Sequence, residues 1–151
     1  MSSRSASYGP LLVGYAAMGL ALLLGARRLG PSAPPRPTAS DVVLIGMGTF
    51  KLSRLFAKEK VLQPVRAPFV EDVEPGAGSE VNCEPAGTGL RRAIGELITC
   101  PFCISVWIAT VFVAAFAVVP RAVRLVGAGL TAVVVADTTQ HVYTALRDRA
   151  S

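Results

Sequence analysis

Long apolar runs separated by short polar or proline-rich stretches dominate the pattern along the chain. The first run, PLLVGYAAMGLALLLGA, covers residues 10–26 and is closed by Arg27 and Arg28. Its length is near the lower end of the roughly 17–25 residues that cross a bilayer. A secretory signal peptide is the alternative, but the two arginines stand where small residues should prepare a cleavage site. We therefore predict a retained transmembrane helix over residues 10–26.

A second helix is predicted over residues 41–58, after a proline-rich linker at residues 30–38. Its first half is apolar on all sides, whereas Lys51, Arg54 and Lys58 follow at i, i+3 and i+7 and form a basic face. The helix either crosses the membrane with long basic side chains reaching the headgroups or lies flat in the interface. We favour the crossing.

Residues 61–92 are polar and rich in proline and glycine, which is typical of a loop outside the membrane. Half of the chain's ten acidic residues lie here: Glu71, Asp72, Glu74, Glu80 and Glu84. They could bind a cation or a partner, although a solvated loop is the preferred interpretation.

Two more apolar segments, residues 94–119 and 122–146, close the chain, and Pro120 marks the turn between them. The pattern predicts an all-α fold in which residues 1–151 form one integral membrane helical bundle. Four transmembrane helices are preferred. Three transmembrane helices plus one interfacial helix are the alternative.

Composition supports a membrane protein, since 52% of residues are hydrophobic and only 17% are charged. The formal charge of +5 could suggest nucleic acid as a partner. However, the basic residues flank apolar segments and form no stripe interleaved with aromatics, so we expect no nucleic-acid binding. The expected partners are the lipid bilayer and a membrane protein or a second copy of the chain.

The distribution of Lys and Arg predicts the orientation, because cytoplasmic loops are enriched in both. Four spans with a cytoplasmic N-terminus place ten basic residues inside and five outside, and three spans place twelve inside and three outside. Both arrangements put residues 61–92 in the cytoplasm. The four-span arrangement puts both termini there as well, and in a bacterium the membrane would be the inner one. A permanent disulfide is not expected in this reducing compartment.

The stretch TCPFC brings Cys100 and Cys103 to the start of the third apolar segment. Thr99 or Cys100 can cap a helix there, with Pro101 in the first turn, where a missing N–H has no consequence. The free N–H groups of that turn favour a thiolate, so the pair is a redox candidate. The preferred alternative is two small residues that pack at a helix entry. A third reading is half of a zinc site, completed by Cys83 or His141, and a fourth is lipidation near the membrane.

Depth along the helices predicts which side chains meet. Counting back from the turn at Pro120 at about 1.5 Å per residue places Asp137 level with Cys103, and His141 near Cys100. Arg54 reaches a comparable depth if the second helix crosses. Because a charge below the headgroups normally has a partner, we predict a structural Arg54–Asp137 ion pair.

The sequence resembles small bacterial multi-pass membrane proteins that carry a domain of unknown function. The matching motifs are TFKLSRL at residues 49–55, PVR at residues 64–66 and TCPFCISVW at residues 99–107. Lys51 stands where that family more usually has arginine. The resemblance extends from about Asp41 to the C-terminus and implies an inner-membrane protein with cysteines on the cytoplasmic side. It implies no activity.

No phosphate-binding loop, nucleophile–base arrangement or string of intramembrane charges is visible in the sequence. We therefore expect a non-enzymatic membrane scaffold or partner-binding subunit. The alternatives are a membrane thiol–disulfide protein that uses Cys100 and Cys103, and a metal site at the cytoplasmic face.

Overall fold

The computed structural model describes residues 2–28, 36–76, 78 and 80–150, and over these residues the protein is mostly helical, with six α-helices and one β-hairpin. The helices are α1 (Ser2–Arg28), α2 (Ala39–Ala57), α3 (Gln63–Arg66), α4 (Gly89–Thr99), α5 (Pro101–Val118) and α6 (Pro120–Ala150). Short 3₁₀ turns at Lys60–Leu62 and Ala67–Phe69 flank α3, and the hairpin consists of β1 (Val70–Pro75) and β2 (Val81–Pro85). Most of the predicted linker lies outside the described residues.

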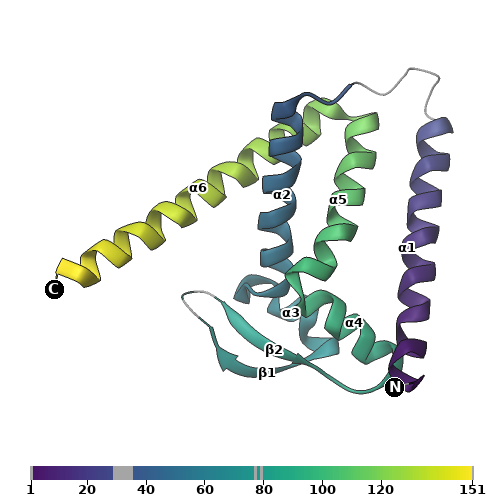
Figure 1. Ribbon diagram of the computed structural model, residues 1–151, viewed down its shortest axis with the longest axis horizontal. Helices are drawn as coiled ribbons and strands as arrows, with labels where there is room; N and C mark the ends of the chain where they lie inside the picture. The colour runs from purple at the N-terminus through teal and green to yellow at the C-terminus, as the bar shows by residue number, and fades with distance from the viewer. Residues whose placement is uncertain (1, 29–35, 77, 79, 151) are drawn as a thin grey trace.

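Three long helices, α1, α2 and α5, run side by side, and α6 leaves the bundle at an oblique angle (Figure 1). The hairpin, α3 and α4 gather at the end of the bundle where α1 begins. Helix α2 is central, because it packs against both α5 and α6, whereas α1 packs against α4 and α5. Phe112 and Phe116 of α5 and Val123 of α6 form the buried core, with Ile45 and Leu52 of α2 packed against them.

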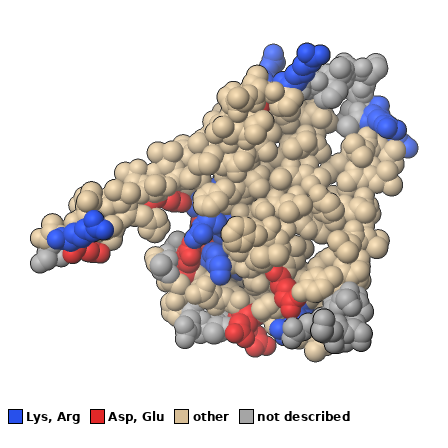
Figure 2. All heavy atoms as spheres, viewed as in Figure 1, with Lys and Arg blue, Asp and Glu red and all other residues tan. Residues whose placement is uncertain are grey.

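Three helices in the described part of the chain are long and apolar enough to cross a membrane: Tyr8–Gly25 within α1, α5, and α6. On the face drawn in Figure 2, a broad uncharged surface separates basic residues at one end from mixed charges at the other. These features confirm a mostly helical protein with apolar helices of membrane-spanning length. Helix α2 is not one of the three, and its 19 residues include Asp41, Lys51 and Arg54.

The fold is mostly helical, as predicted, but it is not all-α, and the loop predicted at residues 61–92 is wrong. This region holds α3, the hairpin and the start of α4, and the two strands pair antiparallel from Val70↔Pro85 to Pro75↔Val81. The hairpin is held against α4 at Gly95, where an added Cβ would lie 2.5 Å from the carbonyl oxygen of Phe69. Only glycine permits that contact, so this part of the chain is packed although its composition is that of a loop.

The third apolar segment, predicted as one helix over residues 94–119, is two helices. Cys100 separates α4 from α5 and has extended backbone angles, φ −101° and ψ 106°. Proline disfavours helical angles in the residue before it, so Pro101 explains the break. The predicted second helix agrees with α2 within two residues, whereas α1 and α6 extend beyond the predicted first and fourth helices.

Candidate functional site

A polar cleft of about 700 Å³ lies between α2, α6 and the turn of the hairpin. Figure 2 shows this hollow beneath α6, with acidic and basic side chains around it. Two other hollows, of about 680 and 650 Å³, lie along α5 and have almost entirely apolar walls. The titratable side chains that line the polar cleft are Lys51, Arg54, Glu59, Glu80, Asp137 and His141.

Lys51 joins the two main walls of the cleft. Its ammonium group donates to the carboxylate of Glu59, which follows α2, and to Asp137 of α6 at 2.9 Å. The Lys51 side chain is only 11% exposed. A buried ammonium group is stable only when it is paired and hydrogen-bonded, so both carboxylates are needed where they lie.

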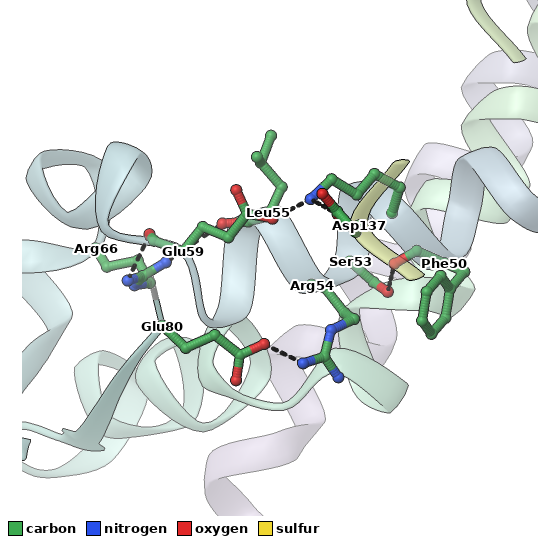
Figure 3. A network of polar contacts seen from close by, with 9 residues as sticks. Phe50, Ser53, Arg54, Leu55, Glu59, Arg66, Glu80 and Asp137 are labelled. Atoms are coloured by element: carbon green, nitrogen blue, oxygen red, sulfur yellow. Dashed lines mark hydrogen bonds and ion pairs between the residues drawn. The ribbon is translucent and has the colours of Figure 1, made fainter. Parts of the chain in front are cut away.

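The predicted Arg54–Asp137 ion pair is wrong, because each residue has a different partner. Arg54 pairs with Glu80, the residue before β2 (Figure 3), and Asp137 pairs with Lys51. The Val81 N–H donates to the Lys58 carbonyl at 2.7 Å, which folds the hairpin back against the end of α2. That fold brings Glu80 to Arg54, so Lys51, one helical turn earlier, is left for Asp137.

Arg66 fixes the end of α2 beside the cleft. Its side chain is buried, and the guanidinium donates to the carbonyl oxygen of Glu59 at 3.0 Å (Figure 3) and to that of Phe56 at 2.6 Å. Carbonyls at a helix C-terminus lack intrahelical donors, and a cation there also complements the helix dipole. The sequence interpretation gave this arginine no role, although its position in a P-x-R turn just after a helix was a signal.

Asp41 fixes the opposite end of α2. Its side chain is 2% exposed and accepts two hydrogen bonds from Arg124 of α6, at 2.7 and 3.0 Å. Asp41 also forms a capping box with Thr38, so it serves both the helix start and the contact between helices. Helix α2 is therefore tied to its neighbours at both ends and at Lys51.

The cleft carries an excess of negative charge. Glu59, Glu80 and Asp137 face only two cations, Lys51 and Arg54, among the charged residues that line it. Phe50 and Val134 supply apolar wall, and the imidazole of His141 adds hydrogen-bonding atoms. A site with one surplus carboxylate and part-apolar walls suits an amine or a guanidinium.

Cys100 and Cys103 lie close together at the start of α5. Cys100 is the N-cap residue, and its Sγ accepts a hydrogen bond from the Cys103 N–H at 3.3 Å. Cys103 is exposed, and the two residues form no disulfide.

The structure does not assemble the predicted zinc site. Cys83 lies on β2 opposite Asp72, whereas His141 lies on α6 and lines the cleft. Across the described residues, no three His, Cys, Asp or Glu side chains are grouped so that they could hold a metal ion. The hairpin and α6 each hold their residue in a different place, so neither completes a site with the Cys100–Cys103 pair.

Over its described residues the chain is a small, mostly helical protein with three helices long and apolar enough to cross a membrane and with ion pairs between α2 and α6. The chain belongs to the family described as proteins of unknown function (DUF1360), whose model matches residues 44–143. It is 34% identical over 87 residues to the sporulation protein YjcA of Bacillus subtilis (strain 168). The matched segment covers 55% of this chain and 73% of that protein. No solved structure matches the chain. Helix α1 lies outside the family match, and the match contains every titratable residue of the cleft.

Proposed function

We propose that the protein is a non-enzymatic subunit of the bacterial inner membrane that binds a partner through the polar cleft. The observation that carries this proposal is the surplus carboxylate in a cleft whose charged walls are fixed by ion pairs. Such a cleft would receive a lysine or arginine side chain from a partner protein. The ion pairs would already hold the acceptors in place, so little ordering would accompany binding.

In this proposal α2 is a fourth membrane crossing. It lies beside α5 along the bundle, and Asp41 and Lys51 are paired with residues of α6. Paired charges that face the bundle interior are the form in which ionisable residues occur in membranes. Four crossings put both termini and the hairpin in the cytoplasm and open the cleft to that side, in agreement with the distribution of Lys and Arg.

A direct test uses the full-length protein in nanodiscs of neutral lipid and an acetylated tetra-arginine peptide amide as the probe. We expect saturable binding that weakens as salt is raised. Glu59→Gln and Glu80→Gln should each weaken it about fivefold, the effect of removing one partly exposed charge. Glu84→Gln is the matched control, because Glu84 is exposed on the hairpin and does not line the cleft. Equal losses in all three variants would contradict the proposal.

A second candidate function is thiol–disulfide exchange, favoured by the hydrogen bond from the Cys103 N–H to Cys100 Sγ. The Cys100 thiolate would attack a disulfide of a partner protein and form a mixed disulfide, with one partner thiolate as the leaving group. The Cys103 thiolate would then attack Cys100 Sγ, which releases the partner as a dithiol and leaves Cys100 and Cys103 oxidised. Cys103→Ser should trap the mixed disulfide at Cys100, and its absence after alkylation of intact cells would exclude this function.

A further inference from the structure

The last part of α6, residues 138–150, extends away from the bundle (Figure 1), and we call it the α6 arm. Every residue of the arm is exposed. Most helical stability in proteins comes from packing of an amphipathic face, so a surface that covers the arm would stabilise it. At about 1.5 Å per residue, α6 is roughly 46 Å long, well beyond the roughly 30 Å of a hydrocarbon core. Part of α6 therefore lies outside the hydrocarbon core unless the whole helix is strongly tilted.

The arm and the turn before it have two different faces. The side toward the cleft is mostly polar and carries Asp137, Thr138, His141 and Thr144. Val135, Val142, Tyr143 and Leu146 are all exposed and fall at i, i+7, i+8 and i+11. At about 100° per residue, these four lie on the half of the helix turned away from His141. The arm is therefore amphipathic, and its apolar stripe faces away from the cleft.

Basic residues border the stripe on both sides. Counted in the same way, Arg147 lies at one edge of the apolar stripe and Arg149 at the other. Both are exposed, and Arg147 makes an exposed ion pair of 3.7 Å with Asp148. An apolar stripe edged by arginines and holding a tyrosine is the pattern of a helix that lies in the membrane interface.

We propose that the α6 arm lies in the headgroup layer of the bilayer. Val142, Tyr143 and Leu146 would then contact acyl chains, and Arg147 and Arg149 would bind the phosphates of anionic phospholipids. The same placement keeps the polar face of the arm over the cleft and in contact with water. It requires that the bundle crosses a bilayer, but it does not require that the cleft binds a partner.

The test places one fluorescent label on the full-length chain in vesicles of phosphatidylcholine with one third phosphatidylglycerol. The background is Cys83→Ser, Cys100→Ser and Cys103→Ser, in which serine keeps an N-cap acceptor at position 100. Single cysteines replace Val142 or Leu146 on the apolar stripe, and His141 or Thr144 on the cleft side as matched controls. We expect labels on the stripe to be quenched by nitroxide lipids and labels on the cleft side by aqueous iodide. Equal quenching of both faces by iodide, or protection of both faces from it, would overturn the proposal.

If the cysteine-free background does not fold, a label-free measurement on the unmodified chain can still test the proposal. Trypsin cleaves after Arg147 and Arg149, and binding to anionic headgroups should protect both bonds. We expect cleavage to be about fivefold slower in anionic than in neutral vesicles for each arginine engaged. Equal rates in both kinds of vesicle would exclude the phosphate contacts. Tetra-arginine binding to the cleft is measured in neutral lipid and does not depend on the outcome of the trypsin test. The two proposals can therefore fail separately.

Discussion

Helices α2 and α5 lie side by side and have nearly the same length, 19 and 18 residues, but they use opposite chemistry. Helix α2 contains three charged residues and buries two of them, Asp41 and Lys51. Helix α5 contains no charged residue, yet large apolar side chains such as Phe102 and Val113 are exposed on it. In water the opposite distribution is expected, with charges outside and apolar residues inside. Helix α2 therefore brings paired charges into the bundle, whereas α5 brings none.

The two helices are also positioned by different forces. The charged residues of α2 have partners on other elements: α6 for Asp41 and Lys51, and the edge of the hairpin for Arg54. Helix α5 is held mainly by the packing of Phe112 and Phe116. Unpaired charges are costly inside a bundle, so substitutions on α2 should have larger effects than substitutions on α5.

The largest effect is expected for Lys51→Met. It leaves Glu59 and Asp137 without their shared cation, and removing one partner of a buried pair costs about 3 kcal/mol or more. The free energy of unfolding can be measured by titrating bicelles with SDS and following the helical circular dichroism signal. We expect a decrease of about 3 kcal/mol.

Two controls separate charge pairing from general disturbance at this position. Lys51→Arg keeps the cation and should remain within about 1 kcal/mol of the native protein. Lys60→Met removes an exposed lysine and should have almost no effect. If Lys51→Met were as stable as Lys60→Met, the view that α2 depends on paired charges would be wrong.

The next effect concerns the capped end of α2. Arg66→Met removes the donors to the carbonyls of Phe56 and Glu59 and should lower the free energy of unfolding by about 2–3 kcal/mol. Arg121→Met changes an exposed arginine at the start of α6 and serves as the control, measured in the same titration. Matching losses in the two variants would show that the cap contributes little.

Sequence reasoning recovered the helices better than the contacts between them. The apolar runs located α1, α5 and α6, and the depth count placed Arg54, Asp137 and His141 near one another, where all three line the cleft. It assigned the wrong partners because residues 61–92 were predicted to be a loop, so Glu80 was not available to Arg54. Contacts such as Gly95 against Phe69, which hold this region against α4, join residues distant in sequence and leave no local periodicity.

A smaller effect is expected where α2 and α6 touch through glycine. A Cβ at Gly127 would lie 3.1 Å from the Leu44 Cβ and 3.2 Å from its carbonyl oxygen, so Gly127→Ala should push the helices apart. We expect a loss of about 1–2 kcal/mol. Gly129→Ala is the matched control on the same helix, because nothing lies within 4 Å of its added Cβ. It should be neutral or stabilising by up to about 1 kcal/mol, since alanine favours helix over glycine. Equal effects would mean that α2 and α6 are not in close contact.

The smallest effect is expected at the start of α5. Cys100→Ala removes the Sγ acceptor of the Cys103 N–H and leaves the Cys100 carbonyl, which accepts from the same N–H at 3.1 Å; loss of an N-cap side chain typically costs about 1 kcal/mol. Cys100→Ser keeps an acceptor and should be close to the native protein in the same SDS titration. Because packing of Phe112 and Phe116 is untouched, the loss from Cys100→Ala should be well below that from Lys51→Met. A loss as large as that of Lys51→Met in both Cys100 variants would instead assign the thiol a structural role beyond capping, and α5 would then depend on a polar contact as strongly as α2 does.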